Sequence, residues 1–438
     1  TAADIDTDAG AITVIFTGNV GGGAWNIETG GSGDTAAVKF RGNATLTSLN
    51  IDKETAEATV TFNGSSAQTV AGDITVTTSG DGKLVISNSN GSGVTFSGAI
   101  GTNSHKIGNL AVVSGSRGNA TFSSTVDATA ADIDTDGGAS TLIFTGDVRG
   151  GAWNIETGGS GDTAAVNFRG DLTLTSLNID KETAEATVTF DGSSAQTIAG
   201  NITATANGDG TLVVNNSNGV TFSGTIGTSG GNKVGNLNVR STATFSSTVD
   251  ATAADIDTDA GSSTVIFTGN VVGGAWNIET GGSGDTAAVN FRGNLTLTSL
   301  NIDKETAEAT VTFDGSSAQT IAGDITATAN GDGTLVISNS NGVTFNDDIG
   351  TSARKIGTVN ITVASTFSST VNASTLDIDT DAGAKIVTFD GNVTGGAWNI
   401  ETGGGTNTAA VKFRGDVNLT TLNTVSYTHL TLPTNREV

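Results

Sequence analysis

The chain alternates apolar and polar residues over short segments that centre on a phenylalanine and a nearby glycine. The segments Val14–Val20, Val38–Gly42, Val60–Gly64 and Val94–Ile100 all follow this order. Alternation with a period of two is typical of a strand with one buried face. We predict that valine, phenylalanine and glycine face inward and that threonine, asparagine, arginine and serine face solvent. We also expect each glycine to leave room for the phenylalanine ring of a neighbouring strand.

The spacing of these segments indicates how the strands are arranged. The first phenylalanines are separated by 22 to 34 residues, which is about the length of one coil of a β-solenoid. Turn signals such as Asn90-Gly91 and Asn218-Gly219 lie between them. Parallel strands need such crossovers, because a two-residue hairpin cannot join them. We therefore predict an all-β fold, a parallel β-helix (β-solenoid).

A longer repeat contains these segments. The sequence Ala24-Trp25-Asn26-Ile27-Glu28-Thr29-Gly30 returns around Trp153, Trp276 and Trp398, at offsets of 128, 123 and 122 residues. We predict modules at 1–128, 129–251 and 252–373, a truncated module at 374–424, and about five coils in each full module. Tandem β-sandwich domains are the alternative. The solenoid is favoured because the pattern crosses the module joins without a linker.

Both ends of the sequence raise expectations of their own. Thr1–Asp4 matches Thr129–Asp132, so we expect the chain to be a fragment that begins inside a longer array. Residues 425–438 hold the only tyrosine and the only proline, and they resemble a translated sequencing-library adapter. We expect this segment to be a non-native tail; a divergent native C-terminus is the alternative.

The composition narrows the classes of function. The 438 residues carry a formal net charge of −25 and contain no cysteine. Phosphate binding needs clustered lysine and arginine, so we expect no nucleic-acid partner. Without cysteine, disulfides and thiolate metal sites are excluded. No run of 18 apolar residues occurs, so we expect no membrane-spanning segment.

An aspartate motif opens each module. Asp132-Ile133-Asp134-Thr135-Asp136-Gly137 matches the start of a calcium loop. An EF-hand also needs a glutamate at its twelfth position, and here that residue is Ile143. The two interpretations are a calcium site and a strand whose aspartates point to solvent. The candidate ligands are Asp4, Asp6, Asp8, Asp132, Asp134, Asp136, Asp255, Asp257, Asp259, Asp377, Asp379 and Asp381.

The tryptophans are the second candidate site. Trp25, Trp153, Trp276 and Trp398 lie between glycines and beside a glutamate, an arrangement that would let an exposed ring stack on a sugar. The alternative is a ring that covers the core at a coil corner. Arg41 and its copies are predicted to face outward and to form ion pairs with acidic residues.

The sequence argues against an enzyme. The recurring Ser65-Ser66-Ala67-Gln68-Thr69 has no accompanying histidine to act as a base. His105 is replaced by Asn232 and Arg354 in the later copies, which does not suit a catalytic residue. Paired carboxylates on a β-helix could cleave polysaccharide, so a tailspike-like depolymerase is a further alternative. We expect no catalytic residues and no cofactor, apart from the possible calcium.

The strand pattern, with Ser-Ala-Gln-Thr-Val/Ile-Ala-Gly and Leu-Val-Ile-Ser-Asn-Ser-Asn-Gly-Val-Thr-Phe, resembles bacterial secreted β-strand-repeat surface proteins. Autotransporter passengers, filamentous-haemagglutinin-like adhesins and S-layer proteins have repeats with a similar strand pattern. The resemblance implies an extracellular, cell-surface location and a structural stalk or adhesin segment, with surface glycans or envelope components as partners. The alternative is a calcium- or carbohydrate-binding repeat module.

Overall fold

The computed structural model describes most of the chain. The described residues are 2–6, 11–29, 36–53, 56–113, 119–134, 140–157, 164–181, 184–228, 230–257, 263–280, 287–304, 307–379, 385–402 and 410–426. The third aspartate of every motif (Asp8, Asp136, Asp259 and Asp381) and residues 427–438 of the predicted tail lie outside these ranges.

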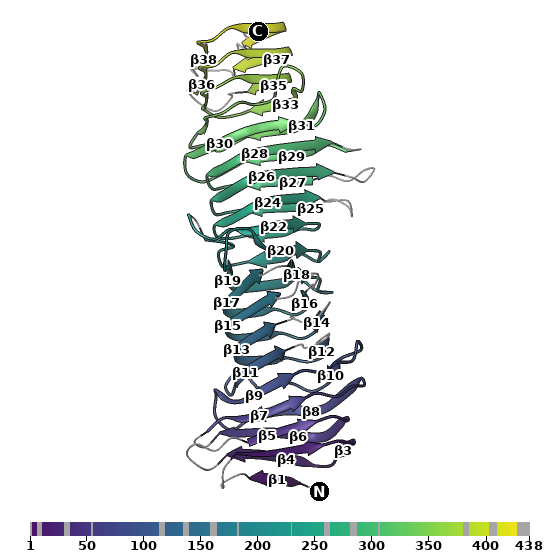
Figure 1. Ribbon diagram of the computed structural model, residues 1–438. Helices are drawn as coiled ribbons and strands as arrows, with labels where there is room; N and C mark the ends of the chain where they lie inside the picture. Colours follow the sequence, from purple (N-terminus) through teal and green to yellow (C-terminus); the bar gives the residue numbers. More distant parts are fainter. Residues whose placement is uncertain are drawn as a thin grey trace, which may run out of the picture. The chain divides into compact units, whose positions relative to one another are not determined.

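The chain forms two compact units, Thr1–Thr252 and Ala253–Val438. Each is built from parallel strands stacked turn upon turn (Figure 1), so the predicted β-solenoid is confirmed. The alternative of antiparallel sandwich domains is wrong, because the described strands pair in parallel with partners one coil away, as β5 does with β7. Within the described ranges the structure contains no helix that would span a membrane.

The strands of the first unit, in chain order, are β1 (Ala3–Asp6), β2 (Ile12–Phe16), β3 (Val20–Gly21), β4 (Ala24–Thr29), β5 (Ala36–Phe40), β6 (Ala44–Lys53), β7 (Ala58–Phe62), β8 (Gln68–Val76), β9 (Asp81–Ile86), β10 (Val94–Phe96), β11 (Ile107–Val113), β12 (Ala120–Phe122), β13 (Val126–Asp134), β14 (Ser140–Phe144), β15 (Val148–Thr157), β16 (Ala164–Phe168), β17 (Leu172–Lys181), β18 (Ala186–Phe190), β19 (Gln196–Ala204), β20 (Asp209–Val214), β21 (Val220–Phe222), β22 (Val234–Val239) and β23 (Ala243–Phe245). The division between the units falls within β24 (Val249–Asp257).

The remaining strands belong to the second unit. They are β25 (Ser263–Phe267), β26 (Val271–Thr280), β27 (Ala287–Phe291), β28 (Leu295–Lys304), β29 (Ala309–Phe313), β30 (Gln319–Ala327), β31 (Asp332–Ile337), β32 (Val343–Phe345), β33 (Ile356–Ile361), β34 (Ser365–Phe367), β35 (Val371–Asp379), β36 (Ile386–Phe389), β37 (Val393–Thr402), β38 (Ala410–Phe413) and β39 (Val417–Ser426).

A typical coil joins a short strand to a long one. In β5 the side chains of Ala36, Val38 and Phe40 are buried while Lys39 is half-buried, as the period-two alternation predicts. The long strand β6 is continuous, but its register with β8 shifts between Thr45 and Ser48. Its residues Ala44, Leu49 and Ile51 are buried.

The phenylalanines of neighbouring coils stack on each other in the core. Phe40 pairs in register with Phe62, and their ring centroids lie 5.3 Å apart at an interplanar angle of 18°. Burying a phenylalanine side chain stabilises a fold by about 1.5–3 kcal/mol. The stack therefore supplies a large part of the cohesion between coils.

Once in each full module the phenylalanine stack changes strand ladder. Phe62 is opposite Ile86 in register, and Phe96 is opposite Val70, so the two phenylalanines belong to different ladders. Their rings nevertheless meet edge to face, with centroids 5.3 Å apart at 88°. The pairs Phe190–Phe222 and Phe313–Phe345 repeat this contact at 83° and 84°. Two strands, β8 and β9, lie between Phe62 and Phe96, whereas one strand separates Phe40 from Phe62, so the stack changes ladder without being broken.

The glycine that follows each phenylalanine has a different role from the one expected. A Cβ added at Gly42 would lie 2.5 Å from the backbone carbon of Gly18, in the coil before it. A Cβ added at Gly170 would likewise lie 2.4 Å from the backbone carbon of Gly146. The expectation that glycine accommodates a ring is wrong: the absent side chain lets two backbones approach at the corner of the coil.

Candidate functional site: polar ladders on the outer face

The tryptophans lie in the core. Trp153, Trp276 and Trp398 have 0–1% of their surface exposed, and only Trp25 is half-buried. The Trp153 ring packs at 5.5 Å from Phe144, and a Cβ at Gly150 would lie 3.0 Å from its Nε1. Gly150 therefore leaves room for both the Ala128 carbonyl and the indole, whereas Gly151 meets the Thr129 carbonyl. The three buried rings offer no face to a sugar, which contradicts the stacking interpretation for them.

The described aspartates of the calcium-like motif point outward. In β13 the residues alternate, with Ile133 fully buried between the exposed Asp132 and the half-buried Asp134. Asp4, Asp6, Asp255, Asp257, Asp377 and Asp379 are likewise exposed or half-buried. Among the described residues, no group of three or more acidic or histidine side chains is placed to hold a metal ion. The motif is thus part of an outward-facing strand.

The first aspartate begins a ladder of side-chain hydrogen bonds across the coils. Asn154 donates from Nδ2 to Asp132 at 3.5 Å, and Asn178 of the next coil donates to Asn154 Oδ1 at 2.8 Å. Asn178 Nδ2 also donates to Thr205 Oγ1 at 2.8 Å. We call this row the amide ladder. Because the donors and acceptors come from successive coils, the ladder joins each coil to the next.

The amide ladder recurs in every module. In the first it contains Asp4, Asn26, Asn50 and Thr77. In the third it contains Asp255, Asn277, Asn301 and Thr328, of which Asn301 donates to Asn277 at 2.8 Å. In the fourth, Asn399 donates to Asp377 at 3.1 Å. The bond from asparagine to aspartate therefore recurs in all four copies, and the bonds further along the ladder recur in the first three.

A row of carboxylates runs beside the amide ladder. Asp134, Glu156 and Asp180 are register partners on three successive strands. Burial raises the pKa of Glu156, and the charges of Asp132, Asp134 and Asp180 raise it further, against the hydrogen bond that it accepts from Asn154 at 2.9 Å. The row therefore concentrates negative charge in a partly desolvated strip.

A buried polar position lies at the start of β13 and its copies, and it is acidic in two of them. Asp127 is 1% exposed and lies 3.6 Å from Arg149 Nη1. Desolvation raises the pKa of Asp127, while the charges of Arg149 and Lys106 lower it. The equivalent Asp250 is 0% exposed and pairs with Lys233, whereas the third copy has the neutral Asn372, which donates to the Gly350 carbonyl at 3.2 Å.

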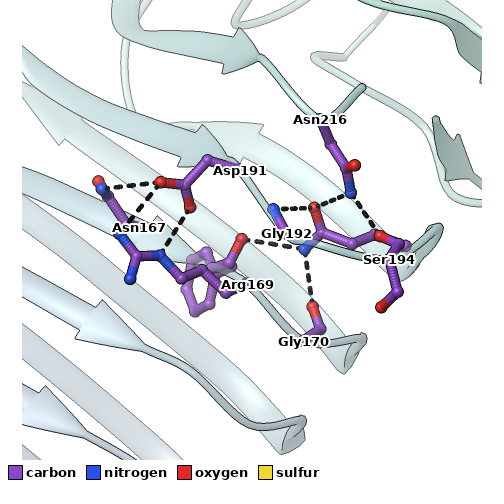
Figure 2. Close-up of polar contacts among 9 residues, drawn as sticks. Asn167, Arg169, Gly170, Asp191, Gly192, Ser194 and Asn216 are labelled. Atoms are coloured by element: carbon purple, nitrogen blue, oxygen red, sulfur yellow. Dashed lines mark hydrogen bonds and ion pairs between the residues drawn. The ribbon is translucent and has the colours of Figure 1, made fainter. Parts of the chain in front are cut away.

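The glutamine of the Ser-Ser-Ala-Gln-Thr motif is the centre of a buried polar clamp, while the other residues of the motif are exposed. Gln196 is 2% exposed; its Oε1 accepts hydrogen bonds from Gly192 N at 2.9 Å and Asn216 Nδ2 at 2.8 Å. Its Nε2 donates to the carbonyls of Phe168 and Gly170, both at 2.9 Å. Figure 2 shows Gly170, Gly192 and Asn216 converging on this amide. Sequence reasoning missed the clamp, although the recurrence of the glutamine with an asparagine 20 residues later was a signal for it.

Three of the four outward arginines form the ion pairs expected from the sequence. For Arg41 the described part of the chain shows no ion pair, and the residue equivalent to Asp191 is the neutral Asn63. Arg169 Nε lies 3.4 Å from Asp191 Oδ1, beside Asn167 (Figure 2). Arg292 pairs with Asp314 in the same manner. Arg414 instead reaches back to Asp390 of the preceding coil, with Nη1 2.7 Å from Oδ1. These side chains are partly exposed, so each pair contributes less than about 1 kcal/mol.

His105 lies in an exposed loop. Its Nδ1 is 2.9 Å from the Oγ of the preceding Ser104, a contact within the loop itself. The later modules have Gly231-Asn232 and Ala353-Arg354 at these two positions. The contact is therefore peculiar to the first module.

Comparison with known proteins assigns no family to this arrangement. No family model, no curated protein and no solved structure matches the chain. The ladders, the clamp and the buried acidic position are therefore interpreted from their geometry alone.

Proposed function

We propose that the chain is a non-enzymatic structural stalk or adhesin segment of a bacterial surface protein, and that it acts in the extracellular space. The observation that carries the proposal is the amide ladder. Its first asparagine donates to the aspartate of the preceding coil in all four modules, and the bond between two asparagines follows it in the first three. Outward polar groups that could have formed a single reactive cluster are used instead to join coils.

This use of side chains suits a protein whose role is to span distance. In a solenoid each repeat contacts only its neighbours, so stability grows with the number of interfaces. A side-chain hydrogen bond contributes about 1 kcal/mol, and the ladder adds several to each module. The net charge of −25 keeps such a surface soluble and disfavours association between copies. The resemblance to secreted β-strand-repeat proteins supports the extracellular assignment.

Removal of one internal module tests the stalk. Deletion of residues 129–251 joins equivalent positions of two modules and removes about five coils, or about 24 Å at ~4.8 Å per coil. Small-angle scattering should show the maximum dimension of the particle falling by that amount while the circular dichroism per residue stays the same. A particle whose maximum dimension is unchanged would contradict the proposal.

The binding-module alternatives need separate measurements. If the aspartate motifs hold calcium, millimolar calcium should raise the melting temperature of the intact chain, and EDTA should reverse the effect. If the surface binds glycans, an array of bacterial and host polysaccharides should show saturable binding. The stalk proposal expects neither effect, and it expects no new reducing ends when the chain is incubated with polysaccharides.

A further inference from the structure

The chain contains six Asn-Gly pairs: Asn63-Gly64, Asn90-Gly91, Asn207-Gly208, Asn218-Gly219, Asn330-Gly331 and Asn341-Gly342. An asparagine followed by glycine is prone to deamidation, because glycine has no side chain to obstruct attack by its own backbone nitrogen on the asparagine Cγ. The attacking nitrogen must lose its proton. A glycine N–H that donates a hydrogen bond in the fold is therefore held back from the reaction.

Five of the six glycine N–H groups donate such a bond. Gly64 N donates to Gln68 Oε1 at 2.8 Å, within the first copy of the clamp. Each of the other four donates to a backbone carbonyl at 2.9 Å. These donors and acceptors are Gly208 and Lys233, Gly219 and Asn216, Gly331 and Lys355, and Gly342 and Asn339.

The sixth pair differs because the first module has two extra residues. In the later modules a turn begins at Asn216 or Asn339 and closes when the glycine of the Asn-Gly pair donates to it. In the first module Gly91 and Ser92 are inserted, and the turn begins at Asn90 and closes at Gly93, with N···O 2.9 Å. Gly91 consequently occupies the second position of the turn, where a backbone N–H has no acceptor within the turn.

The local environment of Asn90 favours the reaction. Gly91 is exposed, and within the described part of the chain its N–H donates no hydrogen bond. Ser92 N donates to Asn90 Oδ1 at 2.8 Å, which polarises the side-chain carbonyl toward attack at Cγ. The Asn90 Nδ2 donates to the Ser65 carbonyl at 3.4 Å, whereas the equivalent Asn218 and Asn341 amides are held at 3.0 and 2.9 Å.

We propose that Asn90 is a site of spontaneous deamidation in the folded protein and that the other five Asn-Gly pairs are protected by the fold. The Gly91 nitrogen forms a bond to Asn90 Cγ, the Cγ–Nδ2 bond breaks, and ammonia leaves with the proton from Gly91. Water then opens the five-membered imide at either carbonyl, which leaves aspartate or isoaspartate at position 90. No oxidant, metal or enzyme is required. The inference is independent of the proposed stalk.

Peptide mapping of the aged protein tests the proposal. The intact chain is incubated at pH 8 and 37 °C, digested at mildly acidic pH, and analysed by mass spectrometry for aspartate and isoaspartate at all six positions. Asn90 should react about tenfold faster than Asn218 and Asn341, a difference of about 1.4 kcal/mol in activation free energy that is close to one hydrogen bond. In urea-unfolded chain the six rates should converge. Equal rates in the folded chain would overturn the proposal.

Deletion of Gly91 and Ser92 separates the effect of structure from that of sequence. The variant reads Ser-Asn-Ser-Asn-Gly-Val-Thr-Phe, identical to Ser338–Phe345, and it still contains an Asn-Gly pair at position 90. Its glycine should donate to Asn88 as Gly342 does to Asn339, and deamidation should slow to the rate of Asn341. A variant with a native circular dichroism spectrum and an unchanged rate at Asn90 would show that the turn does not control the reaction. The Gly91→Ala variant, which hinders the attack directly, should also be slow.

Discussion

The ammonium group of Lys233 lies 2.9 Å from Oδ1 of Asp250, whose side chain has no exposed surface. In the first module the equivalent Asp127 is reached by Arg149 instead, and in the third the position is the neutral Asn372. The carboxylate therefore occurs in this buried place where a cation accompanies it. A charge taken out of water needs such a partner, because desolvation disfavours the ionised form.

Replacement of the cation should destabilise the second module. Lys233→Met leaves the Asp250 carboxylate buried and unpaired, which should lower the free energy of unfolding by about 3 kcal/mol. Hydrogen exchange of the Asp250 amide, which donates to the Ile226 carbonyl at 2.7 Å, reports on this coil. The double variant Lys233→Met/Asp250→Asn should recover most of the loss, because a neutral amide needs no cation in this buried position, which Asn372 occupies in the third module. Equal exchange rates in the single and double variants would refute this account.

The carboxylate row should destabilise the protein at neutral pH, and this destabilisation should be lost as the pH falls. The pKa of Glu156 is raised in the fold, chiefly by burial and then by Asp132, Asp134 and Asp180. The folded state therefore binds the proton more tightly than the unfolded state, so the penalty for ionisation is present at neutral pH. It is relieved as pH falls through the folded pKa and is gone below the unfolded value. Glu156→Gln should stabilise the chain at pH 7, with the difference disappearing in acid.

Asp348 provides a control, because its pKa is lowered in the fold whereas that of Glu156 is raised. The hydrogen bond from Ser369 Oγ lowers its pKa, with further help from the Thr370 N–H at 2.9 Å, and burial opposes them. Stability from this group is present above the unfolded pKa and is lost as pH falls through the folded pKa. Ser369→Ala should destabilise the chain at pH 7 and have less effect in acid. Urea titrations of the Glu156→Gln and Ser369→Ala variants from neutral to acidic pH should show the opposite trends.

The buried clamp should be sensitive to loss of its amide. Gln196→Met removes four hydrogen bonds and leaves the Gly192 N–H, the Asn216 amide and two carbonyls without that partner. Unpaired buried polar groups cost about 1–3 kcal/mol each, so a loss of about 3 kcal/mol or more is expected in urea unfolding. Thr197→Val, on the exposed side of the same strand, is the matched control and should cost little. Similar losses for the two variants would exclude a special role for the clamp.

The tryptophans should matter to stability rather than to sugar binding. Trp153→Ala should lower the free energy of unfolding by about 3–5 kcal/mol, because it empties a large buried volume. Trp25→Ala, at a half-buried copy of the same motif, should cost less. Urea unfolding followed by circular dichroism measures both variants. Saturable glycan binding that is lost in Trp25→Ala, with stability unchanged, would favour the carbohydrate interpretation for that copy.

Much of the fold could be predicted from local pattern. The inward positions of Val38 and Phe40 follow from alternation, and the parallel pairing follows from coil-length spacing between strands. The outward direction of Asp132 and Arg169 follows from the same rule. The candidate sites were less predictable, because the alternation within one strand does not determine which side chains of other coils will contact it. Neither the pairing of Lys233 with Asp250 nor the convergence of Asn216 on Gln196 is visible without the coil-to-coil register.

By itself the sequence determined which residues of each strand are buried, since a period of two leaves a strand only one apolar face. It also determined that contacts such as the bond from Asn154 to Asp132 recur, because the same residues stand at equivalent places in the other modules. Only the tertiary structure decided that Trp153 is enclosed, that Gly42 faces backbone, and that the phenylalanine stack changes ladder between Phe62 and Phe96. These outcomes depend on which residues of neighbouring coils meet, and alternation within a strand does not specify that; the stack changes ladder because two strands, β8 and β9, separate Phe62 from Phe96.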